Sequence, residues 1–273
     1  MITFLAIGPQ KTASTWVYEC LRISGQVCLP AHTKETFFWD EHYDRGIDWY
    51  VNQFPVGRQN GPCGEIGPTY FENSQARERI RRHRRDCKII VTLRDPAARA
   101  YSLYLHHWKK GRISASPAVA FDNEPWLLAG SRYSQHLPAW IDDFGIGNVL
   151  ILLQEDIAVE PATAYTKICE FIGLDGVLPH AGLPGRVNGA TAPRWPLLAK
   201  AMAQVASWAR RSELHRLVNA GKALGLHKVY QGGNTLPTLD PTTRLELTAK
   251  FEKDIDYVER VLHRTLDDWR TAS

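Results

Sequence analysis

Short apolar runs alternate with stretches of helical periodicity along the first half of the chain. The runs are TFLAIG, CGEIG, CKIIVTLRD and NVLILLQ, and the segments KIIVTL and VLILL are continuous enough for strands buried on both faces. Strands that alternate with helices indicate a parallel sheet covered by helices on both sides. We therefore expect one α/β domain over residues 1–273, with a central, mainly parallel sheet.

The last third of the chain is mostly helical in pattern. The stretch from about Pro193 to Leu226 is amphipathic and rich in aromatic residues. From Asp240 a closing helical segment follows. Its apolar stripe, which we expect to be buried, consists of Leu247, Phe251, Ile255, Val258 and Leu262.

A turn rich in polar donors follows the first predicted strand. The sequence GPQKTASTW, Gly8 to Trp16, joins that strand to a predicted helix for which Ser14 or Thr15 is the candidate N-cap. Backbone N–H groups at such a turn can face an anion, and the Lys11 amine and the hydroxyls add donors. A capped turn with a solvent-exposed lysine has the same pattern, so the turn alone leaves both interpretations open.

A second polar cluster follows the predicted strand that ends near Leu93. Asp95 is a natural N-cap for the next helix, and Pro96 suits its first position. Arg94 stands at the strand end and Ser102 two turns into the helix, where an arginine can bind a phosphate through two N–H groups. An Arg–Asp pair that stiffens the turn is the alternative. Because ligands bind at the carboxyl ends of parallel strands, the two polar turns together favour an anion site.

Two nucleotide-binding signatures are absent from the sequence. A Walker A loop has the pattern GxxxxGK[ST], whereas Lys11 follows Gly8 by three residues with no second glycine. The dinucleotide pattern GxGxxG does not occur either. The first turn is therefore predicted to bind an anion without being a standard nucleoside-triphosphate loop, which weakens the hypothesis of a kinase.

Composition narrows the class of protein. A hydrophobic content of 44% with 9 Trp fits a globular domain, and the net charge of +4 is compatible with an anionic ligand. The 5 cysteines are odd in number and form no CxxC, which favours free thiols over a zinc site or a disulfide framework. Since no basic leader and no long apolar run occur, we expect a cytoplasmic protein without a membrane span and without a metal.

The most basic stretch is ARERIRRHRRDCK, residues 76–88. Such a run suggests a nucleic-acid-binding module as a non-enzymatic alternative. However, it lacks interleaved aromatic residues and directly precedes a predicted strand. We interpret it as the outer face of a crossover helix and expect no nucleic-acid partner.

Taken in order, these motifs resemble those of the sulfotransferases that use PAPS (3′-phosphoadenosine 5′-phosphosulfate). AIGPQKTASTWVYECL is similar to their 5′-phosphosulfate loop, and LRDPAARAYSLYLHH is similar to their 3′-phosphate motif RDPxxRAxSxY. KETFFW resembles the KExxFF-type segment of the carbohydrate, heparan-sulfate-like branch. The later stretches RYSQHLPAWIDDFG, EDIAVEP and LDPTTRLELTAKFEKDI also resemble landmarks of that superfamily, so the resemblance spans most of the chain.

The resemblance implies a P-loop-like sulfotransferase fold with PAPS as co-substrate and no metal. Lys11 matches the lysine that contacts the sulfate and the bridging oxygen. The other loop residues match groups around the 5′-phosphate: Thr12, Ala13, Ser14, Thr15 and Trp16. Ligands of the 3′-phosphate and of a later, looser nucleotide loop are implied at Arg94, Ser102, Arg186, Asn188 and Arg194.

The resemblance also implies a general base. Glu35, in KETFFW, matches the glutamate that has this role in the carbohydrate branch, and an acceptor hydroxyl needs a base. A surface pair with Lys34 or Arg45 is the alternative for Glu35. His106 and His107 suggest the histidine base of the aryl and steroid branch, but their place after the 3′-phosphate motif argues against it. We expect four residues on the acceptor side: Lys34, Phe37, Tyr70 and His106.

One segment departs from the family pattern. The branch motif EKxPxYF occurs as EIGPTYF, so Ile66 replaces a lysine while Glu65 and Tyr70 remain. The contact with the acceptor that the lysine makes is thus left open.

The sequence predicts transfer of the PAPS sulfuryl group to a hydroxyl of a small-molecule, glycolipid, natural-product or other glycan acceptor. A P-loop-like small-molecule kinase and the nucleic-acid-binding module are the alternatives. The helical segment 193–239 is predicted to lie on the acceptor side or act as a lid. A homodimer face or simple packing on the sheet would give it the same amphipathic pattern.

Overall fold

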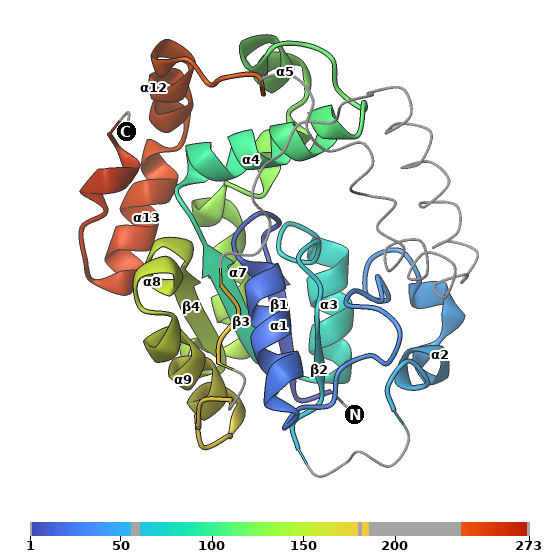
Figure 1. Ribbon diagram of the computed structural model, residues 1–273. Coiled ribbons are helices and arrows are strands. Elements are labelled where there is room, and N and C mark those ends of the chain that lie inside the picture. Colours follow the sequence, from blue (N-terminus) through green and yellow to red (C-terminus); the bar gives the residue numbers. More distant parts are fainter. Residues whose placement is uncertain (1, 56–60, 180–181, 186–235, 272–273) are drawn as a thin grey trace.

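Strands and helices alternate along the chain as expected (Figure 1). The computed structural model describes residues 2–55, 61–179, 182–185 and 236–271. The strands are β1 (Phe4–Gly8), β2 (Gly64–Ile66), β3 (Lys88–Leu93) and β4 (Val149–Leu153). The α-helices are α1 (Ser14–Ser24), α2 (Ile47–Val51), α3 (Ser74–His83), α4 (Pro96–Lys109), α5 (Pro117–Asn123), α6 (Trp126–Ala129), α7 (Tyr133–Phe144), α8 (Gln154–Val159), α9 (Pro161–Ile172), α12 (Pro241–Lys250) and α13 (Glu252–Leu262). The 3-10 helices are η1 (Tyr43–Arg45), η2 (Ile146–Asn148) and η4 (Asp267–Trp269).

The described strands form one parallel sheet in the order β2-β1-β3-β4. Leu5 of β1 pairs with Glu65 on one side and with Ile89 of β3 on the other, and Ile89 in turn pairs with Val149 of β4. The prediction of a mainly parallel sheet is therefore confirmed. Since all four strands run the same way, their carboxyl ends meet at a single edge.

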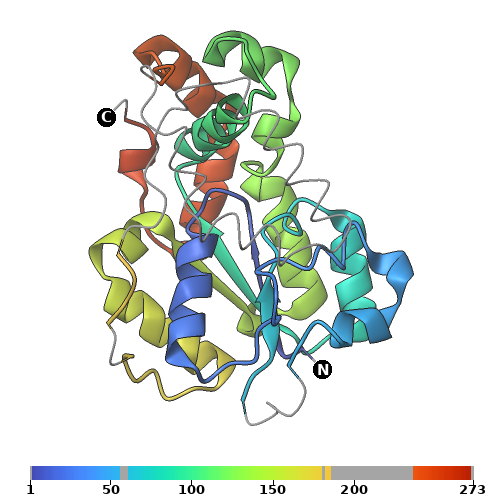
Figure 2. The same ribbon diagram turned by 45° about the vertical axis from the view of Figure 1, so that its right-hand side comes forward.

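Helices cover both faces of the sheet, which explains why its strands are apolar throughout. On one face Leu5 and Ile7 of β1 pack in a core with residues of α3, α7 and α13. On the other face Phe4 and Ala6 pack in a second core with residues of α1 and α9. Figure 2 shows α1 and α9 on one side of the sheet and α7 on the other. The two helix layers hold β1 and β3 in place, and the polar turns follow the ends of these two strands.

Helix α4 lies above the carboxyl edge of the sheet (Figure 1). It begins as predicted, because the Asp95 side chain accepts the N–H groups of Ala97 and Ala98 and Pro96 occupies its first position. A third apolar cluster joins α4 to α5, α6 and α12, with Leu247 of α12 buried in it. The C-terminal part of the chain is thereby packed directly against the helix that carries the second polar cluster.

The closing helical segment consists of two helices that meet at Phe251. Four members of its predicted apolar stripe are buried: Leu247, Phe251, Ile255 and Val258. Leu262 is only partly buried, because it is the last residue of α13. None of the helices in the described part of the chain has the length and apolar character of a membrane crossing.

The basic run 76–88 forms most of α3, the crossover helix between β2 and β3. Ala76 and Ile80 face the core, while several arginines are used in ion pairs within the protein. Arg81 and Arg82 bind Glu78, and Arg77 of the same helix binds Asp143. The interpretation of this run as a helix face is confirmed.

A glycine is required where β1 turns into its loop. Gly8 has a φ of +89°, and a Cβ atom there would lie 2.7 Å from both the Cα and the carbonyl oxygen of Pro68. A side chain at this position would therefore be strained and would collide with backbone. The close approach places the segment after β2 beside the loop that follows β1.

Candidate active site

The loop after β1 has an unusual backbone. Lys11 and Ala13, neither of them glycine, have φ values of 73° and 74° in the left-handed region. Such residues cost about 1 kcal/mol or more each, and they concentrate at ligand-binding loops. Alternation of left- and right-handed residues also turns successive N–H groups toward one concave side, which suits an anion.

Helix α1 begins at Ser14 without a side-chain cap in the described part of the chain. The N-cap position belongs to Ala13, whose carbonyl accepts the first helical hydrogen bond from the Val17 N–H at 3.1 Å. The prediction that Ser14 or Thr15 caps this helix is therefore wrong, because the left-handed Ala13 ends the loop. With no side chain on them, the first N–H groups of α1 are available to an anion.

Thr12 holds the loop from inside the protein. It is fully buried, its hydroxyl donates to the Pro9 carbonyl at 2.6 Å, and it lies 2.8 Å from the Thr92 hydroxyl of β3. The side chain is thus engaged within the fold and is not offered to a ligand. This differs from the expectation that every hydroxyl of the turn serves as a ligand donor.

Several cations gather around the loop. Burial lowers the pKa of Lys11, and the charges of Lys109, Arg94 and Lys34 lower it further. These groups come from the loop, from the end of β3, from the end of α4 and from the segment before η1. Since Lys109, Arg94 and Lys34 are all positive, an anion bound among them and Lys11 would relieve their mutual repulsion.

The Lys34–Glu35 pair lies at the start of α1. The Lys34 amine is 3.2 Å from the Ser14 hydroxyl and 3.1 Å from the Glu35 carboxylate. Both side chains are largely covered, with 21% and 23% exposed. The pair that the sequence offered as an alternative for Glu35 does form, but it places this carboxylate beside the cationic loop.

Glu65 of β2 is a fully buried carboxyl group on which the charge of Glu35 acts. It accepts hydrogen bonds from the Thr36 hydroxyl at 2.6 Å and from the Tyr70 hydroxyl. Burial raises the pKa of Glu65 to about 7, although the two hydrogen bonds lower it. The charges of Asp40 and Glu35 add to the increase. Tyr70 is itself fully buried, so here it orients Glu65 and offers no surface to an acceptor.

Ile66, which stands in place of a lysine, is also fully buried. It packs in the core on the side of α1 and α9. The side chain of this residue does not line the site.

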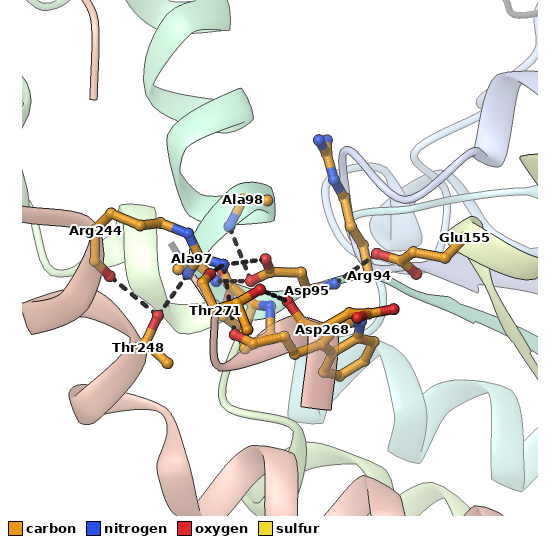
Figure 3. A network of polar contacts seen from close by, with 12 residues as sticks. Arg94, Asp95, Ala97, Ala98, Glu155, Arg244, Thr248, Asp268 and Thr271 are labelled. Carbon is orange, nitrogen blue, oxygen red and sulfur yellow. Dashed lines mark hydrogen bonds and ion pairs between the residues drawn. The ribbon is translucent and has the colours of Figure 1, made fainter. Parts of the chain in front are cut away.

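Arg94 connects the second polar cluster with the first. Its charge acts on Lys11, so the structure brings the two predicted anion-binding turns together. Its carbonyl accepts the Tyr133 hydroxyl at 2.7 Å, and Figure 3 shows its side chain pointing away from the Asp95 carboxylate. That carboxylate pairs with Arg244 of α12. Ser102 lies two turns further along α4 and is half-buried.

Two histidines stand near the C-terminal end of α4. Burial, with the charges of Lys110 and Lys11, lowers the pKa of His106 to about 2. The pKa of His107 falls to about 4, first through burial and then through the charge of Arg112. His106 lies 2.8 Å from the Lys110 amine. Both rings are therefore neutral at physiological pH, in the field of the cations.

The remaining predicted site residues have diverse positions. Trp16 is buried in the core and donates its indole N–H to the Pro184 carbonyl at 3.1 Å, whereas Thr15 is half-buried. Phe37 has a φ of 53° and its carbonyl accepts two backbone N–H groups.

The predicted ligands Arg186, Asn188 and Arg194, and most of the segment 193–239, lie outside the described residues. In the described part of the chain no cluster of His, Cys, Asp or Glu is arranged to hold a metal.

Sequence reasoning missed two buried arginines. Arg99 of α4, 1% exposed, donates to the Ser131 hydroxyl at 2.5 Å and to the Leu127 carbonyl at 2.6 Å. Arg244 of α12 is 7% exposed and reaches Asp95. Arg99 could have been noticed as a charge between the apolar positions of a helix, and Arg244 only through its partner.

The chain is similar in sequence to proteins of known activity. A family model described as "Sulfotransferase domain" matches residues 2–180. The human bifunctional heparan sulfate N-deacetylase/N-sulfotransferase 3 is 31% identical over 202 residues, which cover 65% of this chain and 22% of that protein. The mouse heparan sulfate glucosamine 3-O-sulfotransferase 3A1 is 28% identical over 183 residues, which cover 64% of this chain and 46% of that protein.

A solved structure has a similar fold. The sulfotransferase from Alicyclobacillus acidocaldarius has a TM-score of 0.71 and 21% identity, with 99% of both chains covered. By contrast, this chain spans only 22% and 46% of the lengths of the two curated relatives named above.

Glu65 predicts a pH dependence of stability. Because its pKa is raised from 4.5 to about 7 in the folded protein, the folded state keeps a proton that the unfolded state releases. Stability should then fall as the pH rises from 4.5 to 7, by about 1.4 kcal/mol for each unit of pKa increase. Urea denaturation of Glu65→Gln across this range should lack that fall. The exposed Glu246→Gln serves as the control, and parallel profiles for wild type and Glu65→Gln would refute the assignment.

Proposed function

The chain belongs to the sulfotransferase domain family, and from this premise we propose that it transfers the sulfuryl group of PAPS to an acceptor. The acceptor class is a hydroxyl-bearing small molecule, glycolipid, natural product or other glycan. The observation that carries the proposal is the group of cations around the uncapped start of α1, where Lys11, Lys34 and Arg94 meet. A site made of two anion-binding turns would suit a nucleotide that carries a phosphosulfate at one position and a phosphate at another.

Each anionic group of PAPS has residues that would bind it. The N–H groups at the start of α1 would bind the 5′-phosphate. Arg94 and Ser102 would bind the 3′-phosphate, with the arginine as a charge-assisted donor. Lys11 would lie beside the oxygen that bridges phosphorus and sulfur, where negative charge develops as the S–O bond breaks. Fixed donors at such a position contribute about 3–4 kcal/mol to catalysis.

Glu35 would remove the proton of the acceptor. As the acceptor oxygen forms its bond to sulfur, its proton passes to the Glu35 carboxylate, and the electron pair of the breaking S–O bond leaves with the nucleotide phosphate. The Lys34 ion pair holds this carboxylate at the start of α1. A base placed in this way contributes roughly 10²–10⁴-fold in rate.

The acceptor has to be found by experiment. The two curated relatives are by name an N-sulfotransferase and a glucosamine 3-O-sulfotransferase of heparan sulfate. A panel that scores release of PAP (3′-phosphoadenosine 5′-phosphate) from PAPS should therefore include amino sugars and their N-acetyl derivatives. Phenols, alkyl alcohols and lipid-linked sugars would cover the remaining classes.

Binding of PAP should stabilise the protein far more than binding of ATP or NAD. The reason is that each phosphate of a 3′,5′-bisphosphate would have one of the two proposed anion sites, and a ligand at 100 times its dissociation constant adds about 2.7 kcal/mol. Thermal unfolding with each nucleotide at equal concentration tests this. An equal shift with ATP would refute the proposal and favour a kinase.

Substitutions should separate binding of the nucleotide from turnover. Arg94→Ala and Ser102→Ala should weaken PAP binding measured by calorimetry, because they remove contacts made in the ground state. Lys11→Ala should lower kcat more than it weakens PAP binding, since the charge it stabilises is largest in the transition state. Unchanged PAP affinity in Arg94→Ala would remove the 3′-phosphate assignment.

Replacement of the base should act on the rate alone. Glu35→Gln should retain PAP affinity and thermal stability but lose about 100-fold or more in kcat, because the amide cannot accept the proton. The assay needs an alkyl alcohol or sugar acceptor, since an acidic phenol needs little help from a base. Near-wild-type turnover would exclude Glu35, and His106 and His107 would then be tested.

A further inference from the structure

The Arg244 guanidinium joins the C-terminal part of the chain to the start of α4. One of its nitrogens donates to the Asp95 carboxylate and lies 3.4 Å and 3.3 Å from the carbonyls of Trp269 and Thr271. The other terminal nitrogen of the guanidinium donates to the Thr248 hydroxyl at 2.5 Å. The Arg244 and Asp95 side chains are only 9% and 13% exposed. Figure 3 shows this network, with Arg244 on one side of Asp95 and Arg94 on the other.

Asp95 is held by several partners at once. Besides Arg244, its carboxylate accepts the N–H groups of Ala97 and Ala98 at 3.0 Å and 3.2 Å. Its own N–H donates to the Glu155 carboxylate at 3.0 Å. These contacts fix both the backbone that follows Arg94 and the first turn of α4, on which Ser102 depends for its position.

We propose that Arg244 is a positioning residue for the 3′-phosphate site, where it holds the Asp95 carboxylate away from Arg94. The inference rests on the proposed function, since it concerns the site to which Arg94 and Ser102 are assigned. Arg94 and Asp95 are neighbours in the chain, and the charge of Arg94 acts on the Asp95 carboxyl group. Without Arg244, this carboxylate would pair with Arg94 and compete with the phosphate for it.

The charges near Asp95 from each packed element support this role. Arg94 follows β3, Asp95 is the N-cap of α4, Glu155 comes from α8 and Arg244 from α12. In the described part of the chain, the ion pair of Asp95 is formed with Arg244. Removing it leaves two carboxylates beside Arg94, whereas the helix cap through the other oxygen of Asp95 stays intact.

The test compares PAP with AMP, which lacks the 3′-phosphate. Calorimetry on wild type should show tighter binding of PAP. In Arg244→Gln the affinity for PAP should fall about ten-fold or more while that for AMP stays the same. Arg244→Lys, which keeps the charge but not the fork of donors, should show a smaller loss in the same direction, and it provides the comparison if Arg244→Gln does not fold.

The control is Arg264→Gln, which breaks an exposed ion pair with Asp156 in the same C-terminal part. It should leave the preference for PAP unchanged. A second variant tests the competition directly: in Asp95→Asn the competing charge is absent, so adding Arg244→Gln should no longer lower the preference for PAP.

The outcomes are distinct. An equal loss of PAP and AMP affinity in Arg244→Gln would show a purely structural contact and overturn the inference, as would an unchanged preference for PAP. A wild-type protein that binds AMP as tightly as PAP would instead overturn the proposed function, and the inference with it.

Discussion

Several cations share one edge of the sheet with buried carboxyl groups, and the rest of the site depends on how those carboxyl groups are paired. Three of the acidic groups near this edge accept hydrogen bonds from partners other than Lys11. Asp95 binds Arg244 and the first N–H groups of α4, Glu65 binds the hydroxyls of Thr36 and Tyr70, and Glu155 accepts the Asp95 N–H. Because these three groups have other partners, they compete less for the positive charge around Lys11, whereas Glu35 pairs with Lys34.

This arrangement has a cost in stability. Burial raises the pKa values of Asp95, Glu65 and Glu155 and lowers that of Lys11, which means that each charged form is less favourable in the fold than in water. The left-handed Lys11 and Ala13 add backbone strain. Only the packing of helices on both faces of β1 and β3 can offset such terms. At the carboxyl edge, a bound anion would relieve part of the strain and of the unfavourable burial.

The sequence predicted the features that depend on local pattern. The apolar runs gave the parallel strands, the pair Asp95–Pro96 gave the start of α4, and the basic run around Ile80 gave the crossover helix α3. The N-cap of α1 could not be predicted, since the loop packing sets the left-handed Ala13. Nor could the bond between Arg244 and Asp95, because 149 residues separate the partners and only the packing of α12 on α4 brings them together. The assignments at Arg186, Asn188 and Arg194 stay predictions.

The match to the sulfotransferase domain ends at residue 180, yet the site described above does not. The start of α4 is completed by Arg244, and α12 and α13 fill the cores on which α4 and α7 rest. On the proposed function, the segment that resembles other sulfotransferases would supply the donors for the nucleotide, and the C-terminal helices would hold those donors in place. If both proposals hold, differences among relatives after the matched region that change the partner of Asp95 would alter the 3′-phosphate site without changing any residue that touches the nucleotide.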